Sequence, residues 1–224
     1  LSPSPIEAIE LSSYIDVHHY EEHDEDMMLS LLRELVADRG PRSAVVMANS
    51  DATARLLAVH RAELEPRYAV PFPDVGAMDA LSDKVAFAAA CAAQGLRTPR
   101  QVVVDCSALA DGDPDIPIPF PLVGKAAVGS DWDAAEFPGK RKIYFLDTPA
   151  DLASLWSDLR SAGYQSTFLI QERIPGEDDA MRSVTAYMAS NGEMTMIGSA
   201  RVLLEDHTPT LIGNPVALIT EPFP

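Results

Sequence analysis

Apolar residues recur at helical spacing, or run together, in segments separated by polar turns. Residues 24–38 place Met, Leu and Val three or four apart, with acids at the start and a glycine just after the end, which predicts a helix. The apolar run 43–48 predicts a buried parallel strand, and the polar turn 49–51 leads into a second helical segment at 52–64. This strand–turn–helix order indicates an α/β layer, although the turn lacks the G-x-G-x-x-G of a dinucleotide site.

A connector with several prolines and a glycine follows at 69–81 and predicts a domain boundary. Beyond it the pattern predicts a helix over 84–94, a strand at 101–104 and, where prolines are dense, an irregular loop at 111–121. Residues 126–140 are small and polar, which predicts a mobile loop. The remaining predicted elements are strands at 122–125, 142–146 and 167–171, a helix at 149–161, and a hairpin of 183–188 with 193–204 around Asn191-Gly192.

The 224 residues carry a formal charge of −17, and 47% of them are hydrophobic. This composition suits a folded globular protein, and no stretch approaches the roughly 18 apolar residues of a membrane span. A polyanion repels nucleic acid and anionic membrane, so neither is an expected partner. The charge is unevenly spread, because the first 40 residues hold ten acids against two arginines, whereas all four lysines follow residue 83.

Only two cysteines, Cys91 and Cys106, are present, which predicts reduced thiols and a cytoplasmic protein rather than a disulfide framework. The first residues contain no Met, no basic stretch and no apolar stretch, so they do not form a signal peptide. The last residues, 220–224, are rich in proline. Both ends therefore suggest an incomplete chain. The oligomeric state stays open, with a homodimer through these ends as one arrangement.

Several residues suit the binding of a nucleoside triphosphate. Lys125 ends a predicted strand, where its ammonium can point at phosphate oxygens, and the small-residue loop after it can fold over them with its backbone N–H groups. Trp132 in that loop is either a lid side chain or one that packs on the sheet. The segment 172–174 ends an apolar strand, where extended backbone can meet an adenine edge, and Asp179 can accept hydrogen bonds from ribose.

Four patterns in one order carry a resemblance to a known family. They are Ser82-Asp-Lys84 with a following GLRTP, the strand PLVGK that ends at Lys125, the string QERIPG after an apolar strand, and a basic residue on a later apolar strand. Together they resemble the ATP-grasp fold, in particular carboxylate–amine ligases similar to D-aspartate ligase and to carbamoyl phosphate synthetase. The resemblance implies an α/β (α+β) protein. Its expected parts are a partial parallel-sheet domain that precedes ATP-grasp (1–80), an N-terminal ATP-grasp lobe (81–166) and a partial C-terminal lobe (167–224).

The same resemblance implies a set of site residues and a chemistry. ATP and Mg²⁺ are the expected cofactors, and a small carboxylate and an amine are the expected substrates of an ATP-dependent ligation through an acyl phosphate. By matching position, Lys84 and Lys125 would approach the phosphates, and Lys142 would be the cofactor-binding lysine that follows the mobile loop. The adenine would meet Glu172, Arg173 and Ile174. Asp179 would contact the ribose, and Arg201 would lie near the acyl phosphate and the substrate. Glu177 and Asp178 compete with Asp179 for the ribose.

The sequence departs from the family in one respect and leaves alternatives open. It contains no Glu-x-Asn, the pattern by which these ligases hold Mg²⁺. The alternatives to a ligase are a non-catalytic or truncated ATP-grasp module that binds nucleotide without turnover, and an acidic α/β interaction domain. Individually, the charged candidates also suit solvated positions, turns or simple ion pairs. His19 and His23 lie four apart and suit either a metal site or an acidic, solvated segment.

Overall fold

The computed structural model describes residues 1–5, 7–21 and 24–222, and the chain divides into two compact units, Leu1–Ser82 and Asp83–Pro224. Each unit is described by itself below. The expected first boundary at residue 80 falls two residues before the end of the first unit. His23, part of the suggested His19–His23 metal site, lies outside the described residues.

The first unit is a small α/β layer. Its elements are α1 (Glu7–Glu10), α2 (Glu25–Leu35), β1 (Ala44–Val45), α3 (Asp51–Val59), α4 (Arg61–Leu64), β2 (Tyr68–Ala69) and α5 (Val75–Ser82). Strand β1 pairs in parallel with β2, as the apolar run 43–48 predicts, although only two residues of that run form the strand. Helices α2 and α3 cover the strands through a core that includes Leu32, Leu57 and Tyr68.

Two details of the first unit differ from the sequence pattern. The helix expected at 52–64 is interrupted at His60, which leaves α3 and α4 as separate helices. The connector expected at 69–81 contains α5 after its two prolines, because the Asp74 carboxylate accepts a hydrogen bond from the Ala77 N–H at 2.9 Å and starts the helix.

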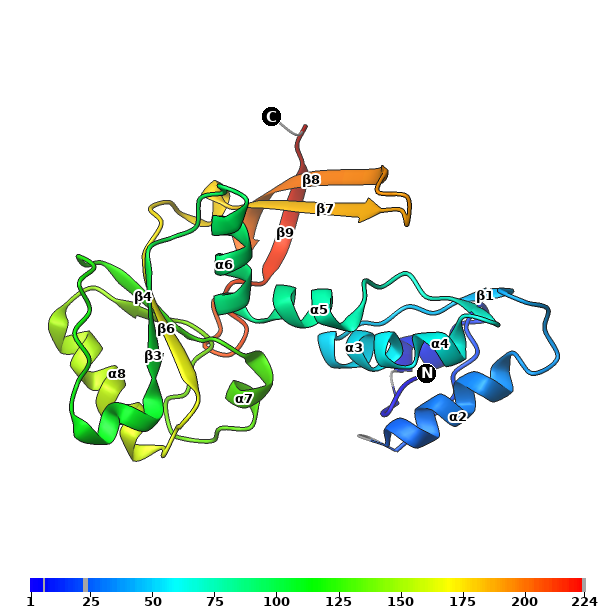
Figure 1. The fold of residues 1–224 in the computed structure, drawn as a ribbon, viewed down its shortest axis with the longest axis horizontal. Helices are drawn as coiled ribbons and strands as arrows, with labels where there is room; N and C mark the ends of the chain where they lie inside the picture. Colours follow the sequence, from blue (N-terminus) through cyan, green and yellow to red (C-terminus); the bar gives the residue numbers. More distant parts are fainter. Residues whose placement is uncertain (6, 22–23, 223–224) are drawn as a thin grey trace. The chain divides into compact units, whose positions relative to one another are not determined.

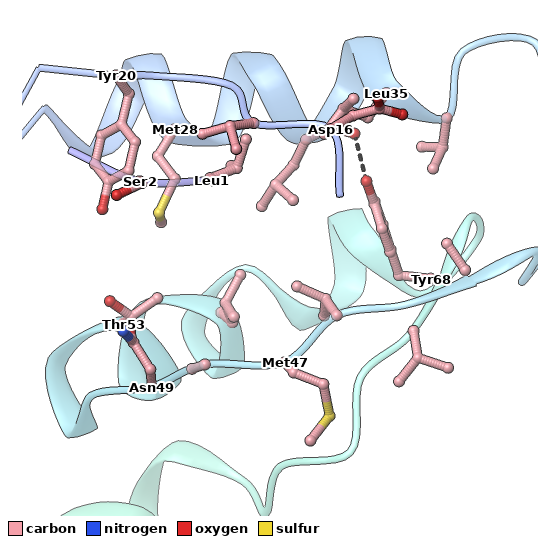
Figure 2. Close-up of a pocket in the computed structure, with 18 of the residues that line it drawn as sticks. Leu1, Ser2, Asp16, Tyr20, Met28, Leu35, Met47, Asn49, Thr53 and Tyr68 are labelled. Atoms are coloured by element: carbon pink, nitrogen blue, oxygen red, sulfur yellow. Dashed lines mark hydrogen bonds between the residues drawn. The ribbon is translucent and has the colours of Figure 1, made fainter. Parts of the chain in front are cut away.

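The first unit also contains a cavity of about 630 Å³. Its walls are mostly apolar and come from the N-terminal segment, α2, β1 and α3; Figure 2 shows Met28 and Met47 among the side chains that line it. Near one end, the Tyr68 hydroxyl donates a hydrogen bond of 2.8 Å to the backbone carbonyl of Leu32.

The second unit begins with α6 (Lys84–Ala93) and continues into a four-stranded antiparallel sheet (Figure 1). The strand order is β3-β6-β4-β5, with bounds Gln101–Asp105, Thr167–Glu172, Leu122–Ala126 and Tyr144–Leu146. Helix α8 (Pro149–Ser161) packs on one face, where Trp156, Leu159 and Phe168 are almost completely buried. Its start is fixed by a capping box between Thr148 and Asp151. Two short helices, η1 (Cys106–Asp111) and α7 (Gly129–Asp133), complete this layer.

A second antiparallel sheet follows in the same unit. After η2 (Asp178–Ala180), the strands β7 (Arg182–Met188), β8 (Met194–Glu205) and β9 (Pro215–Thr220) form a meander in the order β7-β8-β9. The β7–β8 pair is the hairpin expected around Asn191-Gly192, and Gly192 has a φ of 82°, which suits glycine in such a turn. Strand β9 lies in a segment where the sequence pattern predicts no strand.

The first sheet extends past the expected division at residues 166 and 167. Strand β6 pairs with both β3 and β4, so residues through Glu172 belong to the same sheet as Lys125. The expected lobe boundary therefore falls at the first residue of a central strand. The fold class itself is confirmed, because a parallel pair of strands is followed by two mixed α and β layers.

Candidate functional site

All four lysines of the chain line one cavity of about 510 Å³ in the second unit. Lys84, Lys125, Lys140 and Lys142 are joined there by Arg141, and Asp133 contributes the one acidic side chain among the lining residues that the structure describes. Other walls come from the small-residue loop after β4 and from residues 210–214. The name "lysine pocket" is used below for this cavity. Five cations around one space of this size favour an anion with several charges, such as a di- or triphosphate.

Lys84 and Lys125 reach the pocket from two different elements. Asp83 caps α6 by accepting hydrogen bonds from the N–H groups of Val85 and Ala86, which fixes Lys84 as the first helical residue. The Lys84 ammonium donates to the Ala127 carbonyl oxygen at 3.1 Å, directly beyond β4. On β4, Gly124 and Ala126 face the core, so Lys125 projects from the opposite face of the sheet.

The position of Lys125 has an electrostatic cost. Desolvation lowers the pKa of its ammonium below the ordinary value, and the nearby charge of Lys84 lowers that pKa further. A bound polyanion would offset both effects, because its negative charge would attract the two ammonium groups. The pocket is thus arranged to favour an anion over an empty space.

The segment 126–140, predicted to be a mobile loop, contains a short helix and a buried aromatic side chain. It contains α7, and Trp132 is only 6% exposed within the core that packs against the sheet. The indole makes edge-to-face contacts with Phe137, Tyr144 and Tyr164 at centroid distances of 5.5, 6.2 and 5.2 Å. Of the two alternatives for Trp132, packing on the sheet is the one found, and the segment predicted to be a mobile loop contains the short helix α7.

Lys142 is held by the connection between β8 and β9. Its backbone N–H donates to the Pro209 carbonyl at 2.8 Å, and its ammonium donates to the Asn214 side-chain oxygen at 2.8 Å. The segment 210–214 therefore closes one side of the lysine pocket. The predicted strand 142–146 is shorter, since β5 begins only at Tyr144, and Lys142 lies in the preceding coil.

The predicted adenine-binding segment lies at the end of β6, apart from the residues that line the lysine pocket. The Glu172 carboxylate accepts hydrogen bonds from the Arg100 N–H at 2.9 Å and from its Nε at 2.7 Å. These bonds lower the pKa of Glu172. The Arg173 guanidinium lies 4.8 Å from the Phe145 ring centroid, and Ile174 is 63% exposed. Ile174 therefore presents apolar surface that a base can use, whereas Glu172 is bonded to Arg100 and the Arg173 guanidinium donates to the Asp147 carboxylate at 3.2 Å.

The acids after Gly176 differ in their surroundings. Asp178 accepts hydrogen bonds from the Glu205 N–H at 2.9 Å and makes a 3.0 Å contact with His207, and these bonds lower its pKa. Asp179 is largely exposed and lies 4.0 Å from the Arg201 guanidinium. Asp178 thus has a structural role, while Asp179 offers an accessible carboxylate.

Arg201 projects from β8 and also lies 3.5 Å from the Glu221 carboxylate. Neither Arg201 nor Asp179 is among the residues that line the lysine pocket. The structure therefore brings Lys84, Lys125 and Lys142 together, and places Asp179 with Arg201 in a second group.

No metal site is evident in the part of the chain that the structure describes. Residues 1–5, 7–21 and 24–222 contain no group of three or more His, Cys, Asp or Glu side chains that could hold a metal ion. None of the helices described is long and apolar enough to cross a membrane.

No family model matches the chain. A D-aspartate ligase of Enterococcus faecium (strain Aus0004) is 29% identical over 198 residues, which cover 88% of this chain and 47% of the relative. An L-amino acid ligase from Bacillus licheniformis matches 90% of this chain and 42% of its own with a TM-score of 0.56 and 14% identity. An N5-carboxyaminoimidazole synthetase from Staphylococcus aureus, solved with ADP, matches 87% of this chain and 44% of its own with a TM-score of 0.53 and 14% identity.

The chain has an ATP-grasp fold. The resemblance drawn from the sequence motifs is confirmed, because the relative of similar sequence is a D-aspartate ligase by name and the structural neighbours share the fold. The chain spans about half the length of the curated relative that it matches.

Within this ATP-grasp fold, Lys140 and Arg141 are the pocket residues that sequence reasoning missed. Both lie in the Lys140-Arg-Lys142 cluster, from which only Lys142 was selected, by its match to the family. The available signal was the concentration of every lysine in the ATP-grasp region. That signal indicated a cationic site without showing which neighbours of Lys142 face it.

Asn214→Ala is expected to lower the melting temperature of the ATP-grasp unit by roughly 1–6 °C. The substitution removes the hydrogen bond to Lys142, and one such bond contributes about 0.5–1.5 kcal/mol to stability. Differential scanning fluorimetry measures the change. Gln165→Ala is the matched control, since its exposed amide makes one long local contact of 3.4 Å. Equal melting temperatures for the two variants would show that the Lys142–Asn214 bond contributes nothing.

Proposed function

We propose that the protein is an ATP-dependent ligase that joins a carboxylate to an amine, and that the lysine pocket holds the phosphates of ATP. The observation that carries the proposal is the convergence of all four lysines and Arg141 on one cavity within an ATP-grasp fold. The name of the relative, D-aspartate ligase, and the ADP complex of a structural neighbour support the same chemistry.

The proposal assigns separate tasks to the groups of residues. Lys84, Lys125 and Lys142 bind phosphate oxygens, and Arg141 adds a fifth cation beside Lys140. The segment 172–174 contacts the adenine. Asp179 receives the ribose hydroxyls, for which its exposed carboxylate is better suited than the already bonded Asp178.

The proposed reaction has two steps. A substrate carboxylate oxygen attacks the γ-phosphorus of ATP, the bond to the β-phosphate oxygen breaks, and ADP leaves. The amine nitrogen then attacks the carbonyl carbon of the acyl phosphate, loses a proton, and inorganic phosphate leaves as the amide forms. Positive charges held in place before the reaction stabilise the charge that develops on the transferring phosphoryl group. Arg201 joins this step only after it separates from Asp179 and Glu221.

The expected Mg²⁺ is tested against the side chains that line the lysine pocket. The described residues near the phosphates supply cations rather than the oxygen ligands that Mg²⁺ prefers, and Asp133 is the one carboxylate among those that line the pocket. The residues present therefore do not fit a magnesium site, and the assigned steps rest on lysine and arginine alone.

The second candidate function is an ATP-grasp module that binds nucleotide without turnover. The cations of the lysine pocket favour this second function. They suit phosphate, and the described residues contain no cluster that could hold a metal ion. For the ligase, we propose a small carboxylate and an amine as the substrates. We also propose that it is cytoplasmic and forms a homodimer.

Nucleotide binding is tested first by thermal stability. ADP at a hundredfold excess over its dissociation constant stabilises a native state by about 2.7 kcal/mol, so we expect the melting temperature to rise by roughly 5–11 °C. ATP, ADP and pyrophosphate are each titrated with and without Mg²⁺, and adenosine is the control that lacks phosphate. A shift without Mg²⁺ favours the module. Absence of a shift with any phosphate compound would overturn both nucleotide-based functions and leave the acidic interaction domain.

A further inference from the structure

Lys140 forms hydrogen bonds with backbone carbonyls of its own loop, the one between β4 and β5. The Lys140 ammonium lies 2.6 Å from the Ala135 carbonyl oxygen and 3.3 Å from that of Asp133, and the Lys140 N–H donates to the Phe137 carbonyl at 3.3 Å. Only 17% of the Lys140 side chain is exposed. Its ammonium is therefore committed to Asp133, the last residue of α7, and to the residues after it, including Glu136, whose carboxylate lies 3.9 Å away. A positive charge is favoured at this end of a helix.

The same ammonium also contacts the aromatic anchor of the loop. It lies 5.7 Å from the centroid of Trp132, within the range of a cation–π interaction. The other sides of Trp132 pack against Phe137, Tyr144 and Tyr164. Trp132 is thus held between the core and Lys140, and Lys140 links this buried anchor to the rim of the lysine pocket.

We infer that Lys140 is a positioning residue that holds the loop 128–140 in the shape required to bind a nucleoside di- or triphosphate. The inference rests on the proposed function. It gives Lys140 the task of shaping the loop, whereas Lys84, Lys125 and Lys142 bind the phosphates. The Lys140 ammonium compensates the carbonyl oxygens of Ala135 and of Asp133, a residue that lines the pocket. Without it, both oxygens would lose a charged donor, and the loop would lose the bonds that hold its shape.

Lys140→Met tests this role, because methionine keeps a flexible apolar side chain and removes the charge and the donors. Hydrogen exchange of backbone amides in 128–140, measured without any ligand, is expected to become about tenfold faster. ADP binding, measured by calorimetry, is expected to weaken about five- to tenfold. Lys140→Arg keeps a charged donor and is expected to restore most of the protection and most of the affinity.

Lys142→Met provides the contrast. It is expected to weaken ADP binding while the exchange rates in 128–140 stay at the parent values, since Lys142 bonds to the β8–β9 connection rather than to the loop. A purely structural role of Lys140 would change exchange without changing affinity.

The two levels of the inference fail in different ways. Unchanged exchange in Lys140→Met would overturn the fastening of the loop, whatever the protein binds. Faster exchange with unaltered ADP affinity would overturn the positioning role. If the parent protein binds no ADP, the proposed function fails and the positioning role fails with it, whereas faster exchange in Lys140→Met would still show that Lys140 fastens the loop.

Discussion

Lys125→Met is expected to make the ligand-free protein at least as stable as the parent, and to weaken ADP binding about 10- to 100-fold. The two effects have one cause. The ammonium of Lys125 is desolvated and lies near that of Lys84, so it opposes folding when no anion is bound. When phosphate is bound, the same ammonium donates a charge-assisted hydrogen bond, and such a bond contributes about 1.5–3 kcal/mol. Thermal melts with and without ADP measure both effects.

The difference in stability between Lys125→Met and the parent depends on pH, because the pKa of Lys125 in the parent is lowered. At a pH below the lowered pKa the residue is protonated in both states, and the folded state bears the full cost of the buried charge. As pH rises through the lowered pKa toward the ordinary value of 10.5, the folded state loses its proton first, so the unfolded state binds more protons and the parent gains stability. The stability advantage of Lys125→Met is therefore expected to be largest at neutral pH and to shrink in alkaline buffer.

Arg97→Met is the control for net charge. Arg97 is exposed and is not among the residues that line the lysine pocket, so this variant removes one positive charge without touching the site. It is expected to keep the ADP-induced shift of the parent. If Lys125→Met also keeps that shift, the assignment of Lys125 to the phosphates is wrong.

Helices with local end signals were predictable from the sequence alone. Asp83 and Thr148 each cap a helix with their own side chains, and both helices begin where the sequence indicated. α5 was missed because Pro71, Pro73 and Gly76 indicated a connector, whereas the helix starts only after the prolines and tolerates the glycine. Local composition predicts a break, but it does not show how soon the chain resumes regular structure.

The candidate site was predictable where the residue type limits the choice. A lysine at the end of a buried strand is unusual enough to indicate a function, and Lys125 does line a cationic pocket. The contribution of 210–214 was not predictable, because it depends on a turn that brings Asn214 to Lys142 across 72 positions of sequence. The partners of Glu172 and Asp178 are likewise distant in sequence, so their internal bonds were visible only in the structure.

Gly124→Ala is expected to destabilise the protein by about 1–3 kcal/mol, although it adds a single methyl group. The new carbon would lie 3.0 Å from Leu155 Cδ2 and 3.0 Å from Phe168 Cε1, and both side chains are almost completely buried. Neither can move without opening the core between α8 and the sheet. A fall in melting temperature of roughly 2–12 °C is the expected measurement.

The same substitution tests how the core supports the site. Gly124 precedes Lys125 on β4, so a shift of this strand away from α8 also moves the Lys125 ammonium, and ADP affinity is expected to fall although Gly124 does not line the pocket. Gly198→Ala is the matched control, because a methyl group there meets no heavy atom within 4 Å, and its effect on stability is expected to stay within about 0.5 kcal/mol. If Gly124→Ala and Gly198→Ala have the same melting temperature, the core between β4 and α8 has room for the added methyl group, and the expected clash is wrong. If instead it loses stability but keeps the parent's ADP affinity, the position of Lys125 does not depend on the packing beneath β4.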